Sequence, residues 1–279
     1  MRATANTFDA SQPVTRELYD WMAAQKALGH DRDTLLQAML AAGWSHQVAS
    51  EALSSSAPST PLPVPWPALA DSALSLDGGD RQVAISVLMR EPDLLVLENF
   101  LSTEECQALI AAAKPRLQRS LTVAVETGGD EVHDDRTSEG MFFSRAETAI
   151  VARIEARIAK LLGWPVENGE GLQVLRYRPG AEYKPHYDYF NPDEAGTAAI
   201  LERGGQRVAT FIMYLQEPEQ GGATVFPDLR LQVPARRGQA VFFSYAQAHP
   251  CSHSLHGGMP VLAGEKWIAT KWLREREFF

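Results

Sequence analysis

Apolar residues in the first part of the chain recur at the spacing of amphipathic helices. Leu18, Trp21 and Met22, for example, stand at i, i+3 and i+4, which share one helical face. The pattern and its boundary residues predict three short helices: residues 16–28, stopping at Gly29; a second from about Asp33 to Gly43; and a third from a Ser45 cap to Leu53. Residues 1–53 are therefore expected to form a small helical module, which either binds a protein partner or is a packing extension of the main domain.

Residues 54–79 interrupt this pattern. They contain the run Ser54-Ser55-Ser56 and a proline-rich stretch at 61–67. Proline fixes φ and removes a backbone donor, so such a segment can form neither a regular helix nor a central strand. A semi-extended linker is predicted here.

From residue 80 onward the pattern changes from helices to strands. A buried strand is predicted over 94–97, then a helix capped at Ser102 and a second helix over 146–162 that ends at Gly163. Apolar runs between glycine- and proline-rich turns predict further strands over residues 171–177, 208–215, 240–245 and 267–273. This order predicts an α+β domain over 80–279, with helices supporting a jelly-roll barrel.

Two polar segments, 127–140 and 190–205, exceed the usual length of connections and are expected to be mobile lids. The first contains Gly128-Gly129-Asp130-Glu131, which offers little apolar area for packing. We expect it to order only when a peptide supplies the missing contacts.

Composition narrows the class of partner. The formal charge of −9 and the pI near 5.3 argue against a general nucleic-acid or anionic-membrane binder. No apolar run is long enough to span a bilayer, and residues 1–12 lack the apolar core of a signal peptide. Cys106 and Cys251 are the only cysteines, which fits a reducing compartment. A cytoplasmic protein is expected, with neither nucleic acid nor membrane as partner.

The candidate chemistry starts from His186 and Asp188. Side chains two residues apart on extended backbone point to the same side. One further imidazole from a distant strand would complete a 2-His-1-carboxylate site, the ligand set of non-haem Fe(II) oxygenases. Three histidines near the C-terminus could supply it, namely His249, His253 and His256.

The residues around this pair carry a resemblance to a known family. Upstream the chain reads Tyr177-x-x-Gly180-x-x-Tyr183-x-x-His186-x-Asp188, and downstream it has the segments 254–262 and 264–272. From about residue 90 to the C-terminus, it resembles the prolyl 4-hydroxylase family of Fe(II)- and 2-oxoglutarate-dependent dioxygenases. The resemblance implies a double-stranded β-helix.

The same resemblance implies roles in the binding of metal and cosubstrate. His256 becomes the third iron ligand, because Lys266 follows ten residues later, on the next barrel strand. A lysine inside a barrel is costly unless paired, and the far carboxylate of 2-oxoglutarate would pair with it. Tyr177 and Thr224 match a hydroxyl pair around that carboxylate. Lys271 is expected on the outer face of an edge strand, and His249 and His253 in solvated loops.

Six further positions match the peptide contacts of similar enzymes: Arg136, Ser138, Glu170, Tyr183, Arg207 and Trp272. The expected activity is hydroxylation of a prolyl residue, at C4, in a peptide or protein, with 2-oxoglutarate and O2 giving succinate and CO2. L-ascorbate is implied as the reductant that rescues oxidised iron. Two alternatives stay open at this point, the same chemistry on a free amino acid or another side chain, and a non-catalytic binding protein on a degenerate jelly-roll.

Overall fold

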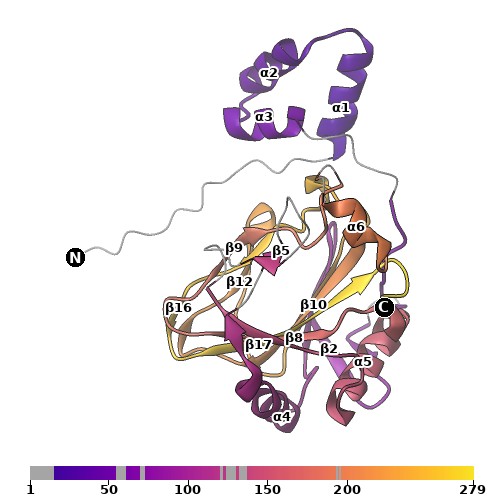
Figure 1. Ribbon diagram of the computed structural model, residues 1–279. Coiled ribbons are helices and arrows are strands. Elements are labelled where there is room, and N and C mark those ends of the chain that lie inside the picture. The colour runs from indigo at the N-terminus through magenta and orange to yellow at the C-terminus, as the bar shows by residue number, and fades with distance from the viewer. Residues whose placement is uncertain are drawn as a thin grey trace, which may run out of the picture.

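The computed structural model describes residues 16–54, 61–69, 73–119, 122–123, 130–131, 137–192, 194 and 196–279. Three helices at the N-terminus lie at one end of a strand-rich domain, and the helices α4 (Thr103–Ala113) and α5 (Ala149–Leu162) lie on the side of that domain away from them (Figure 1). Among the described residues, no helix combines the length and apolar character needed to cross a bilayer.

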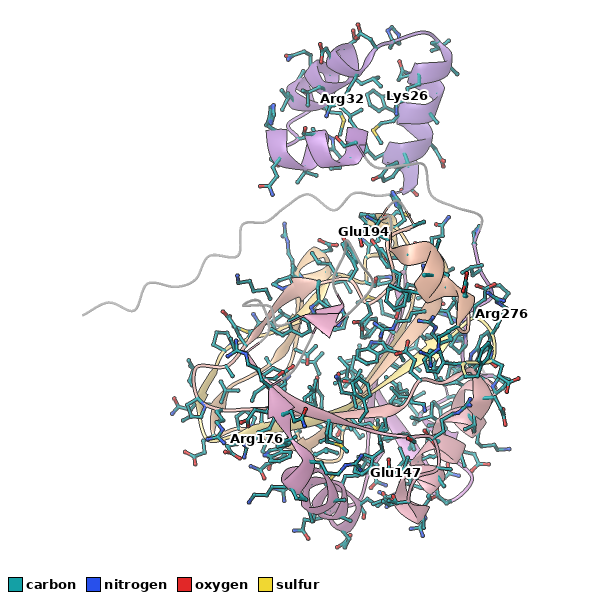
Figure 2. All side chains as sticks on the ribbon, in the orientation of Figure 1. Lys26, Arg32, Glu147, Arg176, Glu194 and Arg276 are labelled. Atoms are coloured by element: carbon teal, nitrogen blue, oxygen red, sulfur yellow. The ribbon has the colours of Figure 1, made fainter. Side chains whose placement is uncertain are left out.

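The predicted N-terminal helices are present as α1 (Arg16–Ala27), α2 (Arg32–Ala41) and α3 (His46–Ser54). Asp31 caps α2 by accepting a 2.8 Å hydrogen bond from the Thr34 amide. Ser45 caps α3, as expected, through the Val48 amide at 3.2 Å. Arg32 donates across from α2 to the hydroxyls of Ser50 and Ser54 on α3 (Figure 2).

This helical module contacts the strand-rich domain through α1. The rings of Tyr19 and His249 meet edge to face with centroids 4.2 Å apart. Cys251, in the same loop as His249, packs against the core of the module. The loop that precedes His256 is therefore in contact with the module.

Residues 61–69, in the predicted linker, run along the barrel without regular structure. The Leu62 amide donates to the Ala246 carbonyl at 2.7 Å, and the Trp66 ring lies 6.0 Å from that of Phe242. The large sheet begins at Ser75, ahead of residue 80.

Two antiparallel sheets form the barrel. The large sheet has nine strands in the order β1 (Ser75–Asp77), β2 (Gln82–Arg90), β3 (Asp93–Glu98), β14 (Ala240–Ser244), β10 (Arg207–Gln216), β17 (Lys266–Arg274), β8 (Leu172–Tyr177), β7 (Glu139–Phe143) and β4 (Gln118–Arg119). Opposite it lies a sheet in the order β13 (Leu231–Val233), β12 (Thr224–Phe226), β15 (His256–Gly258) and β9 (Tyr183–His186). Two short pairs complete the strands, β11 (Gln220–Gly221) with β16 (Val261–Ala263) and β5 (Thr122–Val123) with β6 (Asp130–Glu131).

The two faces of the large sheet contribute to two different hydrophobic cores. On β17, Trp267, Ala269 and Leu273 belong to the core that the sheet forms with the helices. Ile268, on the alternate side, belongs to the core between the two sheets. The predicted α+β jelly-roll supported by helices is confirmed, and the interior of the barrel is the space between the sheets.

The supporting helices are α4 (Thr103–Ala113) and α5 (Ala149–Leu162). Ser102 and Glu105 form a capping box at the start of α4. The second helix begins at Ala149, three residues later than the predicted residue 146, because Ala146 has a left-handed φ of 53° and Thr148 provides the cap. Gly163 ends α5 with φ 61°, as expected.

Of the two predicted lids, 190–205 is not a structureless loop, because it contains α6 (Thr197–Glu202). Within 127–140, positions 127–129 and 132–136 lie outside the described residues. Four single-turn 3₁₀ helices occur among the described residues: Lys114–Arg116, Val166–Asn168, Pro227–Leu229 and Pro250–Ser252.

Lys271 corrects one expectation. It does lie on the face of β17 opposite Lys266, but β17 is a central strand and Lys271 is only 2% exposed. Its ammonium donates to the Glu155 carboxylate of α5 and to the Glu170 carbonyl. The expectation of an edge strand was wrong because β17 lies between β10 and β8, and α5 covers this face of the sheet.

We expect Lys271→Ala to lower the free energy of unfolding by about 3–5 kcal/mol, because it leaves the Glu155 carboxylate buried without its partner. Urea unfolding followed by circular dichroism measures this. The control is Lys160→Ala, at an exposed lysine of α5, the helix that carries Glu155. It should change the free energy of unfolding by less than about 0.5 kcal/mol. Equal effects of the two substitutions would show that the buried pair is not a structural element.

Candidate active site

His186, Asp188 and His256 meet at one point inside the barrel. His186 ends β9, His256 begins β15, and the two are direct partners in the register of these strands. His186 Nε2 lies 3.6 Å from Asp188 Oδ1, and His256 Nε2 lies 3.4 Å from Asp188 Oδ2. One ligand atom from each residue falls within 4.8 Å of the others. The antiparallel pairing thus brings together residues about seventy positions apart in the sequence.

Neighbouring groups fix the orientation of all three side chains. His186 Nδ1 lies 2.8 Å from the Lys184 carbonyl, and His256 Nδ1 lies 2.9 Å from that of Ser254. With the proton on Nδ1, each ring donates to its carbonyl and directs the lone pair of Nε2 toward the shared point.

The carboxylate of Asp188 is held from the opposite side. Its Oδ2 accepts a 2.7 Å hydrogen bond from Thr210, whose hydroxyl is 3.0 Å from that of Tyr245. Sequence reasoning missed Thr210 and Tyr245, since no motif distinguishes them from other barrel residues. They support Asp188 only because β10 and β14 pass behind it.

Burial and neighbouring charge set the protonation of the group. Burial lowers the pKa of His256 to about 4, so its imidazole is neutral near pH 7. Burial alone would raise the pKa of Asp188, but His256, His186 and Arg207 hold it below its ordinary value. Two imidazoles and one carboxylate are the donor set that fits Fe(II) and leaves positions open for cosubstrate and oxygen.

The other two histidines lie elsewhere. Of the three candidates, His256 is the one that the structure places beside His186 and Asp188. His249 is 5% exposed, accepts from the Cys251 amide and packs on Tyr19, so the expectation that it is solvated was wrong. The N-terminal module covers it. His253 is half-buried, with a left-handed φ of 52°.

Lys266 lies deep in the barrel, 2% exposed, opposite Tyr177 in the register of β17 and β8. Its Nζ is 5.4 Å from the ring centroid of Tyr177 and 5.8 Å from that of Tyr214. Burial lowers the pKa of Lys266 to about 7, and no acidic side chain in the described part of the chain forms an ion pair with it. A buried cation without a protein anion fits a dicarboxylate cosubstrate.

Thr224 and Tyr177 lie on opposite sheets beside this lysine. The Tyr214 hydroxyl donates to Thr224 Oγ1 at 2.7 Å. Burial raises the pKa of Tyr214 well above its ordinary value, so the hydroxyl stays protonated. Tyr214 is a further residue that the sequence did not reveal, and it fixes the Thr224 hydroxyl near Lys266.

Three of the six predicted peptide contacts, Arg207, Glu170 and Trp272, form one cluster. Arg207 Nε and Nη2 donate to the two carboxylate oxygens of Glu170 at 2.7 and 2.9 Å, and its Nη1 donates to the Asp188 carbonyl at 3.2 Å. The guanidinium lies 4.0 Å from the ring centroid of Trp272. Arg207 therefore connects this cluster to the candidate metal ligand.

Tyr183 stacks on His186 with ring centroids 3.7 Å apart, so its ring lies next to one of the candidate metal ligands. Ser138 is buried, just before β7. Arg136 lies outside the described residues. The roles of these six positions toward a peptide stay predictions.

Comparison with known proteins agrees with this geometry. The model of the 2OG-Fe(II) oxygenase superfamily matches residues 172–274, which include all three candidate ligands and Lys266. The fold and the site thus define a 2-oxoglutarate-dependent dioxygenase.

The relatives define the family more closely. The chain is 41% identical over 221 residues to prolyl 4-hydroxylase 5 of Arabidopsis thaliana, covering 72% of this chain and 74% of that protein. It is 45% identical over 209 residues to prolyl 4-hydroxylase 1 of the same plant, covering 68% and 71%. A crystal structure of the viral collagen prolyl hydroxylase of Paramecium Bursaria Chlorella virus-1, in complex with 2OG, superposes with a TM-score of 0.51 at 31% identity, covering 65% of this chain and 95% of that one. The chain belongs to the prolyl 4-hydroxylase family of Fe(II)- and 2-oxoglutarate-dependent dioxygenases, as the sequence motifs indicated.

Proposed function

We propose that the enzyme hydroxylates prolyl residues, at C4, in a peptide or protein, with release of succinate and CO2. The observation that carries this proposal is the arrangement of side chains in the interior of the barrel. His186, Asp188 and His256 share this interior with the buried Lys266, which has no ion-pair partner in the described part of the chain, and the cluster of Arg207, Trp272 and Glu170 adjoins Asp188. The relatives named as prolyl 4-hydroxylases support the choice of proline as acceptor.

Each group has a defined task in this reaction. His186, Asp188 and His256 would hold Fe(II), which supplies the oxygen chemistry when bound. Lys266, with the Tyr177 and Thr224 hydroxyls, would orient 2-oxoglutarate through its far carboxylate. A prolyl ring has no charge and, within a chain, no amide donor, so ring packing must recognise it. Tyr183 and Trp272 offer aromatic faces for that purpose.

We expect an extended proline-containing peptide to gain one oxygen on proline and free proline to be a poor substrate, because it lacks the flanking carbonyls. Mass spectrometry of peptide and of free proline, each incubated with enzyme, Fe(II), 2-oxoglutarate and ascorbate, measures both. His186→Ala is the inactive control. Turnover of free proline at the rate of the best peptide would overturn the peptide assignment in favour of the amino-acid alternative.

Ascorbate and the cellular compartment are further parts of the proposal. Omitting ascorbate from the same assay should shorten the linear phase of turnover, if it serves to restore ferrous iron. The chain's two cysteines lie in its described part and form no disulfide with each other, which supports a reducing compartment, the cytoplasm. Fractionation of cells that produce the protein tests this assignment.

We further propose that the N-terminal helical module holds part of a protein substrate. Trp21 and Leu28 of this module are 37% and 72% exposed, and α1 touches the loop before His256. The double substitution Trp21→Ser/Leu28→Ser should raise KM for a protein substrate about tenfold and leave KM for a short peptide unchanged. An equal effect on both substrates would instead support a packing role for the module.

A further inference from the structure

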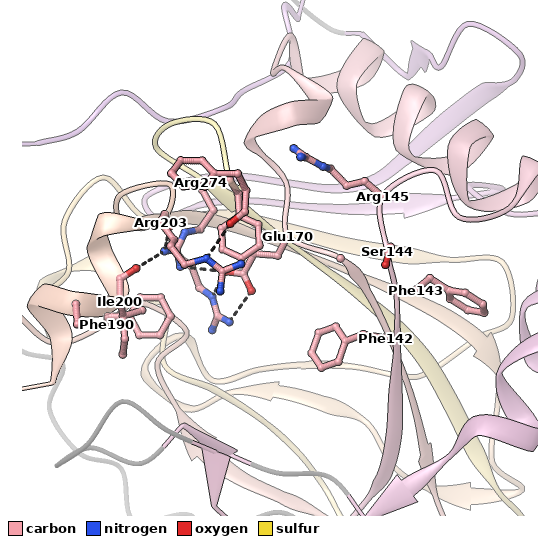
Figure 3. A pocket seen from close by; sticks show the side chains of 14 residues that line it. Phe142, Phe143, Ser144, Arg145, Glu170, Phe190, Ile200, Arg203 and Arg274 are labelled. Carbon is pink, nitrogen blue, oxygen red and sulfur yellow. Dashed lines mark hydrogen bonds and ion pairs between the residues drawn. The ribbon is translucent and has the colours of Figure 1, made fainter.

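A cavity of about 890 Å³ lies beside the Glu170 and Arg207 pair. One wall carries Phe142, Phe143, Ser144 and Arg145 at and beyond the end of β7 (Figure 3). The facing wall carries Phe190, Arg203, Arg274 and Glu170. Its size lies in the range of ligand sites, and its lining combines aromatic rings with guanidinium groups.

The positive charge inside this cavity exceeds the negative charge. Arg207 and Arg274 are direct partners in the register of β10 and β17, an arrangement of like charges that is normally unfavourable. Glu170 Oε1 lies between them, 2.7 Å from Arg207 Nε and 3.1 Å from Arg274 Nη1. In the part of the chain that the structure describes, Glu170 is the one carboxylate that hydrogen-bonds to these two buried cations. Arg145 and Arg203 add further cations to the lining.

Some buried N–H donors of the same cluster also lack an acceptor in the described part of the chain. Arg274 is 1% exposed, and its Nη2 donates to the carbonyls of Ile200 and Arg203. Its Nε, however, has no hydrogen-bond partner in the part of the chain that the structure describes, and neither has the buried Nε1 of Trp272. A buried donor without an acceptor is costly, and at Arg274, which lines the cavity, it points to an acceptor group that comes from outside the chain.

The cosubstrate cannot be this acceptor. Lys266 and Arg274 stand at opposite ends of β17 and, because their positions differ by an even number, on the same face of the strand. Strand geometry separates them by roughly 26 Å, at about 3.3 Å per residue, which is far longer than 2-oxoglutarate. Arg207, by contrast, touches both Glu170 and the Asp188 carbonyl, so the cavity adjoins the metal point.

We propose that this cavity binds a carboxylate of the polypeptide substrate, at a position near the hydroxylated proline. A carboxylate supplies the missing negative charge and accepts from guanidinium groups in bidentate geometry. The rings of Phe142 and Phe190 suit the apolar stem of an acidic residue. The inference rests on the proposed prolyl-peptide activity and specifies which peptides the enzyme prefers.

The test is a set of otherwise neutral, capped peptides with one central proline. In one series each peptide carries a single glutamate, placed at one of the four positions on either side of the proline. The matched peptide has glutamine at the same position. In a second series the only carboxylate is a free C-terminus at increasing distance from the proline, with the amidated peptide as match. This separates a side-chain carboxylate from a terminal one. Fluorescence anisotropy gives Kd, and mass spectrometry gives KM and kcat.

We expect one position at which the carboxylate lowers Kd and KM by about tenfold or more relative to its match, as charge-assisted hydrogen bonds do. Arg274→Gln should abolish this preference. Because Arg274 is buried, Arg145→Gln and Arg203→Gln at the edge of the cavity provide a second test and should each reduce the preference. Arg276→Gln, an exposed arginine of the same C-terminal segment (Figure 2), should preserve it.

Failure of this inference and failure of the proposed function give different results. If the neutral peptides bind and are hydroxylated to the same extent as every acidic peptide, the carboxylate site is overturned and prolyl hydroxylation stands. A preference that persists in the arginine variants also overturns it. If none of the peptides binds or is hydroxylated, the peptidyl-proline activity itself is overturned.

Discussion

Asp188→Asn should lower Fe(II) affinity and kcat by more than about a hundredfold, because it removes the one negative charge from the proposed ligand set. Outer-sphere partners of metal sites alone contribute about 10–100-fold, and a direct ligand should contribute more. Asparagine has nearly the same volume and keeps an oxygen that can accept from Thr210. The expected loss is therefore electrostatic and does not require a change in packing.

Calorimetric titration with Fe(II) under anaerobic conditions measures the metal affinity independently of turnover. His253→Asn is the matched control, since it removes a nearby histidine outside the proposed ligand set, and asparagine tolerates the left-handed φ of 52°. It should bind iron like the unmodified enzyme. Loss of iron binding in the His253 variant, with retention in Asp188→Asn, would overturn the ligand assignment.

Lys266→Met should raise KM for 2-oxoglutarate by about a hundredfold, because removing one partner of a desolvated charge pair costs about 2–5 kcal/mol. Fe(II) affinity should be nearly unchanged. Without cosubstrate, the variant should be more stable than the unmodified enzyme, because Lys266 is buried with no ion-pair partner in the described part of the chain. This sign is opposite to that expected for Lys271→Ala.

The pH dependence provides a second readout for Lys266. Its pKa of about 7 in the free enzyme means that the cation needed for pairing is present below pH 7 and is lost above it. Cosubstrate binding above pH 7 then requires proton uptake, so KM for 2-oxoglutarate should be flat below pH 7 and rise by up to about tenfold per pH unit above it. Lys266→Met should show no such rise. A Lys266 variant with normal KM would mean that another cation binds the cosubstrate.

Much of the architecture could be predicted because it depends on local rules. The Ser102 capping box, the Ser45 cap and the left-handed Gly163 determine helix ends through contacts within a few residues. Apolar runs between glycine- and proline-rich turns identified the buried strands β3, β8, β10, β14 and β17. Ala146 misled the prediction of α5, because alanine seldom adopts a positive φ and the sequence gives no sign of it.

The sequence by itself determined that His186 and Asp188 share a strand side, that the chain carries the motifs of a 2-oxoglutarate oxygenase, and that helices precede strands. The family motifs selected His256 as the third residue, and the tertiary structure places it beside the other two. Only the tertiary structure decided that Lys271 is buried against Glu155 and that His249 lies under Tyr19. The same holds for the shared use of Glu170 by Arg207 and Arg274. Each of these depends on side chains from strands or helices far apart in sequence, whose burial and pairing are set by packing between layers and leave no mark in local spacing.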